Sequence, residues 1–198
     1  YMVLAAIIAA IGIILDSEIL VVGAMVVGPE FGPIAAVAVA LVQRRGALAR
    51  RSLVALLVGF LVAVVAAYVG TEAILALGLV DSGSHSGDVR PFTGFISHPN
   101  AISFLIAYLA GTAGILSLTT SKSSVLIGVL ISVTTIPAAS NVAVAAAESD
   151  WAECGEAAAQ LGLNLAALLI AGLVTLGVQR SAFAARGRRR RADATEPS

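Results

Sequence analysis

The sequence predicts an all-α, polytopic membrane protein that folds as a helical bundle of about six spans. Of its 198 residues, 59% are hydrophobic and only 12% are charged, and the charges gather in short stretches between long apolar runs. Each run reaches or approaches the ~20 residues that an α-helix needs to cross a hydrocarbon core. The runs are rich in Ala, Leu, Val and Gly without polar alternation, which favours helices over the strands of a membrane barrel.

The expected spans follow one another with short connections. They cover residues 1–15, 19–42, 52–70, 101–118, 123–147 and 157–179. A shorter apolar piece, 73–80, is expected at the membrane interface. Residues 81–100 have the composition of an outer surface loop and divide the transmembrane region, 1–180, into halves 1–80 and 101–180. The last residues, 181–198, are expected to form a basic, disordered tail.

Basic residues set the expected orientation, because Lys and Arg near span ends are retained on the cytoplasmic side. With an even number of spans, nearly all of them fall on one face: Arg44, Arg45, Arg50, Arg51, Lys122, Arg180, Arg186 and Arg188 to Arg191. The other face receives most acidic residues and Arg90. We therefore expect a multi-pass protein of the plasma (inner) membrane with both chain ends cytoplasmic. The terminal Arg cluster is expected to anchor the chain at anionic membrane lipid, and nucleic acid is not expected as a partner.

The two halves of the chain share a sequence pattern. Three positions of the first half have counterparts in the second, pairing Gly12 with Gly114, Gly23 with Gly128 and Pro33 with Pro137. Because each half has an odd number of spans, the second half must enter the membrane from the opposite side. The pattern predicts a 3+3 inverted-topology repeat, as found in many transporters.

Prolines are expected to break the second and fifth spans near their centres. A proline has no N–H and releases the carbonyl four residues before it, so Pro29, Pro33 and Pro137 predict two broken helices. Two interpretations stay open. The polar residues nearby repair two kinked helices, or two discontinuous helices face a solute or ion near the midplane.

Polar residues at membrane depth define the candidate site. Glu30 is the only acidic residue well inside a span, where a charged group costs at least ~2.5 kcal/mol; its plainer interpretation is a solvated or protonated residue in a water-filled dent. Asn164 is also explained by a hydrogen bond to a neighbouring helix. The hypothesis for solute or ion binding names Glu30, Pro29, Gly32, Pro33, Thr134, Thr135, Pro137, Asn141 and Asn164.

Several segments resemble a known family. Residues 7–15 (IIAAIGIIL), 21–34 (VVGAMVVGPEFGPI) and 110–114 (AGTAG), with the helix around Asn164, are similar to the uncharacterised hydrophobic domain family, domain of unknown function 389. The resemblance extends from Tyr1 to about residue 180. It implies the helical membrane fold and, since family members often carry a cytoplasmic domain upstream of the spans, a similar domain before this chain.

The family pattern places Ser-Pro-x-x-Gly-Pro after Gly-Ala-Met. This chain has Gly28 in place of the Ser, Glu30 where an uncharged residue is usual, and a single Pro137 where a Pro-Pro pair is common. The resemblance therefore implies that Pro29, Gly32 and Pro33, which match the family pattern, are important. It implies nothing about Glu30 or about a transported substrate.

The sequence contains none of the motifs typical of an intramembrane enzyme. It has no His-Glu-x-x-His zinc motif, no Gly-rich phosphate loop with Lys and no pair of aspartates inside the spans. With Cys154 as the only cysteine, no intrachain disulfide is possible. We expect no enzymatic activity, no bound metal and no cofactor.

Two functions remain open. The leading one is a transporter or channel-like permease for a small solute or ion, and the alternative is an oligomeric membrane anchor or sensor module that relays to a cytoplasmic domain. Gly59, Ala63 and Ala67 give one face suited to close helix contact, and a homo-oligomer is expected. A water-accessible cavity that reaches Glu30 and Asn141 would favour transport, whereas a dry, packed break would favour the module.

Overall fold

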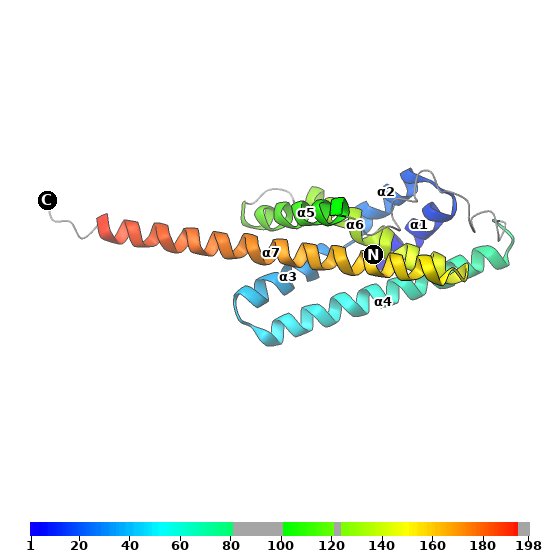
Figure 1. The fold of residues 1–198 in the computed structure, drawn as a ribbon, viewed down its shortest axis with the longest axis horizontal. Helices are drawn as coiled ribbons and strands as arrows, with labels where there is room; N and C mark the ends of the chain where they lie inside the picture. The colour runs from blue at the N-terminus through cyan, green and yellow to red at the C-terminus, as the bar shows by residue number, and fades with distance from the viewer. Residues whose placement is uncertain (81–100, 121–123, 194–198) are drawn as a thin grey trace.

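The computed structural model describes residues 1–80, 101–120 and 124–193, and within them the side chains of 1–80, 101–118 and 135–183. The described residues form an elongated bundle of helices and include no strand, which confirms the all-α prediction (Figure 1). The helices are α1 (Met2–Ile14), α2 (Glu18–Val27), α3 (Phe31–Val42), α4 (Gly46–Ala76), α5 (Ala101–Thr120), α6 (Ser124–Ala147) and α7 (Trp151–Asp193).

Fewer helices than expected meet the length of a membrane span. Three are long and apolar enough, Gly46–Ala76, Ala101–Leu118 and Trp151–Phe183, and α2 with α3 adds a fourth if this pair, bent by 52°, counts as one. The part of α6 with described side chains, Thr135–Ala147, is a shorter apolar helix. With 13 residues, α1 is about 20 Å long against a core of about 30 Å. The chain is thus a membrane protein with three to four such spans among its described residues, and the expected number of six is not confirmed.

The burial pattern is that of a membrane bundle. Small residues fill the interior: Ala5, Ala6, Ala9, Ala24, Ala63, Ala67, Ala107, Ala110, Ala139, Ala143, Ala157, Ala167 and Ala171. Large apolar side chains cover the outside of α4, where Leu57, Leu61 and Val65 are each more than half exposed. Small interior residues let helix backbones approach closely, and the large ones outside suit contact with lipid.

The small-residue face of α4 is used within the chain. Ala63 and Ala67 are fully buried, and a Cβ added to Gly59 would lie 2.9 Å from the Sδ of Met2 in α1. This face packs on α1, which lies beside the half of α4 that begins near Gly59. The close helix contact expected of this face is therefore one within the chain, and the homo-oligomer stays a prediction.

Four helices end on a residue in the left-handed backbone conformation. These residues are Asp16, Arg44, Gly78 and Ser149, with φ between 47° and 62°. At each, its own N–H and that of the next residue bond to carbonyls of the last helical turn, which is the Schellman arrangement. Three of these turns, at Asp16, Arg44 and Ser149, join two helices through three residues and reverse the chain, so α1 packs on α2, α3 on α4 and α6 on α7.

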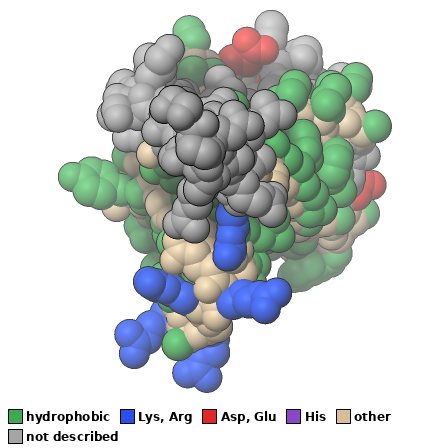
Figure 2. All heavy atoms as spheres, turned by 90° about the vertical axis from the view of Figure 1, so that its left-hand side faces the viewer, with side chains coloured by type: hydrophobic (Ala, Val, Ile, Leu, Met, Phe, Trp, Pro, Cys, Tyr) green, Lys and Arg blue, Asp and Glu red, His purple; other side chains and the backbone are tan. Residues whose placement is uncertain are grey.

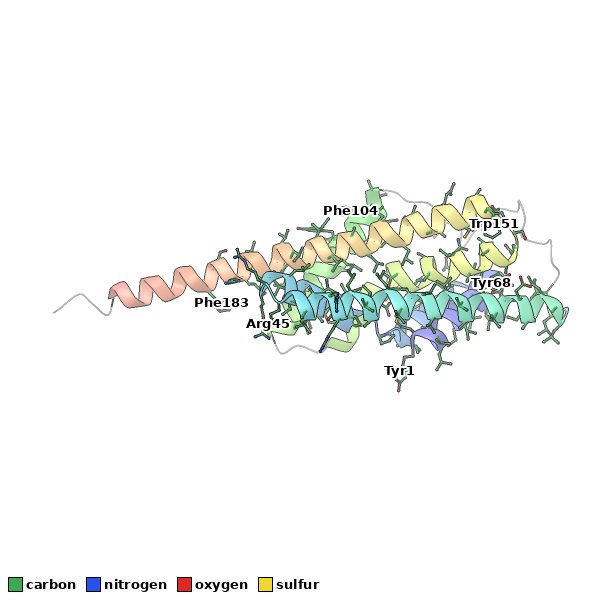
Figure 3. All side chains as sticks on the ribbon, turned by 90° about the horizontal axis from the view of Figure 1, so that it is seen from below. Tyr1, Arg45, Tyr68, Phe104, Trp151 and Phe183 are labelled. Carbon is green, nitrogen blue, oxygen red and sulfur yellow. The ribbon has the colours of Figure 1, made fainter. Side chains whose placement is uncertain are left out.

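Charge divides between the two ends of the bundle. The side chain of Arg180 on α7 donates a 3.0 Å hydrogen bond to the Val42 carbonyl at the end of α3, which brings it beside Arg44 and Arg45. We call this the basic end; Figure 2 looks onto it and shows Arg side chains, in blue, on this side of the molecule. In Figure 3, Trp151 and the end of α4 lie at the other, acidic end.

The expected gathering of basic residues on one face is thus confirmed for the described side chains, whereas Lys122 lies outside them. The turns after α1 and α6 carry Asp16, Glu148 and Asp150. These two turns lie at the same end of the bundle, because Ile14 near the end of α1 packs in one cluster with Val144 near the end of α6. Which end is cytoplasmic stays a prediction.

The last helix is longer than the sequence suggested. α7 has 43 residues and continues to Asp193, so residues 181–193 are helical where a disordered tail was expected. Ala and Arg are among the best helix formers, and they dominate this stretch. The helix therefore extends beyond the bundle past the basic end (Figure 1).

Candidate functional site

The break between α2 and α3 is the first part of the site. Gly28, which ends α2, is extended with φ −67° and ψ 126°, as expected for a residue before a proline. Glu30 is the residue before the first residue of α3 and makes no side-chain capping bond to it, and Pro33 is the third residue of that helix. At this position an N–H has no intrahelical partner, so Pro33 fits the helix start and only the segment around Pro29 makes the break.

Glu30 lies in the centre of the bundle. Its side chain has no exposed surface, and its Oε1 accepts a 3.0 Å hydrogen bond from the Oγ1 of Thr135 on α6. Thr135 is fully buried as well. The structure thus brings together, from positions 105 residues apart, two of the residues that the sequence assigned to one site.

Pro137 does not break the fifth span. It is buried, and α6 is continuous from Ser124 to Ala147 around it, so the prediction of a second broken helix is wrong. A single proline removes one hydrogen bond of the helix, and the bonds on either side can hold the helix together. The Oγ of Ser140 also lies 2.9 Å from the Ile136 carbonyl and 3.0 Å from the Ala6 carbonyl of α1, which fastens this part of α6 to its neighbour.

Asn141 joins α6 to the start of α7. Its Nδ2 donates a 2.9 Å hydrogen bond to the Oε1 of Glu153, and Asn141 is only 1% exposed. Glu153 lies in the first turn of α7, which Asp150 caps by accepting bonds of 3.1 Å and 3.0 Å from the N–H groups of Ala152 and Glu153. The sequence predicted only that Glu153 is one of the acidic residues of the outer face, and it did not indicate the pairing with Asn141.

Two further amides of α7 are buried. Asn164 is 1% exposed and Gln160, which the sequence analysis did not single out, is 4% exposed. Because α6 and α7 form an antiparallel hairpin, residues at equal distance from its turn lie at equal depth. Gln160 and Asn164 are therefore within about 6 Å of the depth of Thr135 along the bundle. The sequence feature that could have indicated Gln160 is its spacing of four residues from Asn164, which places both amides on one face of a helix.

The remaining residues of the hypothesis lie elsewhere. Pro29 and Gly32 are exposed and Pro33 is half-buried, so these three shape the break from its outer side and do not line the interior. Thr134 is part of α6, but its side chain lies outside the described residues. Thr71, Ser117 and Thr175 are buried polar side chains as well, but they are not part of the site. We call the six buried polar residues described above the interior polar set: Glu30, Thr135, Ser140, Asn141, Gln160 and Asn164.

This polar set offers one carboxyl, hydroxyls and amides in an apolar surrounding. Such groups can exchange a proton at the carboxyl or surround a small cation with oxygen atoms. Among the described residues, no group of three or more His, Cys, Asp or Glu side chains is placed to hold a metal ion.

A bundle of apolar helices with Ala-lined contacts and a carboxyl buried at a helix break defines the class as a helical membrane protein. The chain belongs to the family described as domain of unknown function (DUF389), whose model matches residues 25–170. This confirms the resemblance found in the sequence. The match begins in α2, ends in α7 and includes every residue of the interior polar set. No curated protein and no solved structure matched the chain.

Proposed function

We propose that the chain is a permease for a small solute or ion, with Glu30 at the centre of the site that binds it or exchanges a proton with it. One observation carries the proposal: a carboxyl without exposed surface stands where a helix is broken inside a membrane bundle. An ionisable group is costly at that depth. Its hydrogen bond to Thr135 links the break to the other half of the chain. The contact between the two halves is where an inverted repeat would place its binding site.

The packing of the helices supports an inverted repeat. Within the halves, α1 packs on α4 as α5 packs on α7, and α3 packs on α4 as α6 packs on α7. Between the halves, α4 packs on α6 as α7 packs on α3. Moreover, α1 runs toward the acidic end and α5 toward the basic end, while α4 and α7 run in opposite directions (Figure 1). Exchanging the halves by a half-turn about an axis in the membrane plane would give this set of pairs.

One observation favours the second candidate, the anchor or sensor module. Glu30 is 0% and Asn141 1% exposed, so the break is packed and closed to outside solvent in this conformation, which is the packing that the module predicts. In a permease, the same packing would be an occluded state. The 43 residues of α7 form about 64 Å of helix, enough to cross the membrane and continue as a stalk. Homo-oligomers and cytoplasmic chain ends are part of both proposals.

The proposal is tested by flux measurements in proteoliposomes with a panel of ions and small solutes and a pH-sensitive dye inside. Glu30→Gln keeps the shape of the side chain and removes its titration, so it should abolish the pH or cation dependence of flux. Glu18→Gln, the same change at an exposed residue of α2, should leave flux unchanged. Normal flux in Glu30→Gln at every pH, or no flux of any kind in the unmodified chain, would contradict the permease.

Chemical labelling separates the two candidates. The variant Thr135→Cys, made together with Cys154→Ser, carries its only thiol beside Glu30. A permease must expose this thiol to water during its cycle, so a small water-soluble methanethiosulfonate should label it in liposomes. Protection over hours, with Cys154 of the unmodified chain labelled as a control, would favour the module.

A further inference from the structure

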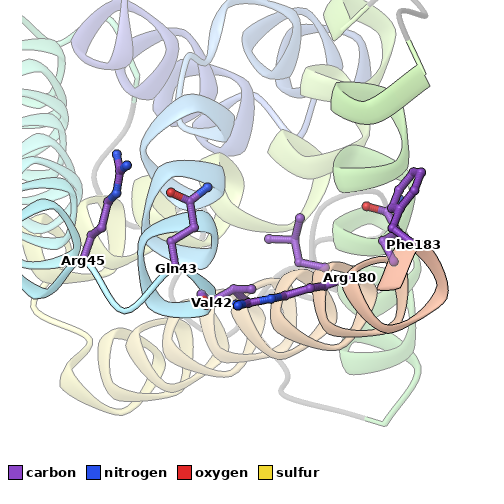
Figure 4. A pocket seen from close by; sticks show the side chains of 7 residues that line it. Val42, Gln43, Arg45, Arg180 and Phe183 are labelled. Carbon is purple, nitrogen blue, oxygen red and sulfur yellow. Dashed lines mark hydrogen bonds between the residues drawn. The ribbon is translucent and has the colours of Figure 1, made fainter. Parts of the chain in front are cut away.

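The basic end contains a hollow between the turn after α3 and the outer part of α7. Its volume is about 460 Å³, within the usual range for small-molecule sites. The residues that line it are Val42, Gln43, Arg45, Leu176, Gln179, Arg180 and Phe183. Figure 4 shows Arg45 and Gln43 projecting from the turn and Arg180 extending along α7 toward Val42.

We propose that this hollow binds the phosphate of an anionic phospholipid. Arg45 lines it together with Arg180, and Arg45 also lines a neighbouring hollow of about 530 Å³ with Arg51. The guanidinium group matches phosphate oxygens with a planar fork of N–H donors. No acidic residue lines either hollow in the described part of the chain, so the positive charge is not neutralised by a neighbouring carboxylate.

The geometry holds Arg180 at the hollow. One of its nitrogens, Nη1, donates to the Val42 carbonyl at 3.0 Å, which fixes the guanidinium between α3 and α7 and leaves its other N–H groups for a ligand. Arg45 is exposed in the turn between α3 and α4. The two charges thus come from two different elements that line the same hollow, the turn after α3 and α7.

The apolar part of the lining indicates a lipid as the source of the phosphate. Val42, Leu176 and Phe183 line the hollow beside the arginines, and the outer face of α7 continues toward the membrane with Val178 and Val174, which are 62% and 47% exposed. A free phosphate ion would gain nothing from these side chains. The glycerol and acyl chains of a phospholipid would cover them while the headgroup meets the arginines at the membrane surface.

The site is tested with the full chain in an uncharged detergent, by titration calorimetry with dioctanoyl phosphatidylglycerol, dioctanoyl phosphatidylcholine and inorganic phosphate. Phosphatidylglycerol should bind more tightly than the other two. An arginine that lies beside the anionic headgroup is expected to tighten lipid binding about five-fold. Arg45→Gln should therefore weaken binding about five-fold, and its combination with Arg180→Gln about thirty-fold.

The matched control is Arg50→Gln, which removes the same charge from an exposed residue that lines neither hollow; it should change binding less than two-fold. Arg45→Gln is the decisive variant, because the helix contact of Arg180 stays intact in it. Equal losses in Arg45→Gln and Arg50→Gln would overturn the site in favour of diffuse attraction. Inorganic phosphate binding as tightly as the lipid would overturn the lipid as its occupant, and absence of phosphatidylglycerol binding would overturn both.

Discussion

The hydrogen bond between Thr135 and Glu30 should contribute measurably to the stability of the bundle. Thr135→Val keeps the shape of the side chain and removes the donor of the 3.0 Å bond. Neither side chain has exposed surface, so water cannot replace the lost partner without a rearrangement. Bonds between membrane helices contribute about 0.6 kcal/mol on average and up to about 1.7 kcal/mol, and bonds to an ionised group about 1.5–3 kcal/mol. We therefore expect a loss of about 1–2 kcal/mol.

A double-mutant cycle with Glu30→Leu isolates this bond. Replacing both partners by apolar groups of similar shape is close to neutral, so Thr135→Val should cost less than about 0.5 kcal/mol in the Glu30→Leu background. Stability is measured as the free energy of unfolding in mixed micelles of increasing dodecyl sulfate content, followed by circular dichroism. If Thr135→Val cost the same in both backgrounds, the bond would contribute nothing and the reasoning would be refuted.

Three other predictions concern helix packing, a helix cap and orientation. Gly111→Ala should lower the free energy of unfolding by about 1–2 kcal/mol, because its Cβ would lie 2.9 Å from the Leu168 carbonyl oxygen; Gly162→Ala, where nothing lies within 4 Å, should instead raise it by up to about 1 kcal/mol. Asp150→Ala should cost about 1 kcal/mol by removing the cap of α7, and Asp150→Asn should keep most of it. Cys154, which is partly exposed near the acidic end, should react with a membrane-impermeant maleimide in intact cells; reaction only after permeabilisation would show that the orientation is inverted.

The sequence predicted the helices well because apolar runs and their polar boundaries are local features. The expected range 19–42 matches α2 and α3, and 101–118 matches most of α5. Depth in the bundle is not a local feature. The first run had nearly the right ends, but α1 spans only part of the length of α4. At Pro137 the sequence shows the missing N–H but not the bonds of Ser140 that hold α6 in place.

The candidate site was predicted in part, for the same reason. Glu30 and Thr135 could be assigned to one site because both lie near the middle of their apolar runs, and the structure joins them. The partner of Asn141 could not be predicted, because Glu153 was expected among the acidic residues of the outer face. Only the hairpin of α6 and α7 brings the two side chains together. Gln160 was missed because a single amide in an apolar run carries no indication of which neighbours it faces.

The alanine contacts inside the bundle determine how freely its helices can move. An Ala side chain has no rotamers to lose on burial, so at the contact of α1 with Ala63 and Ala67 the alanines add no ordering cost, and only larger side chains such as Met2 beside Gly59 interlock. A shift of one helix along the other at such a contact changes the rotamers of few side chains. For the hairpin of α1 and α2, the hydrogen bond from Ser140 to the Ala6 carbonyl is then a directional contact that would have to open before the hairpin could shift along α6.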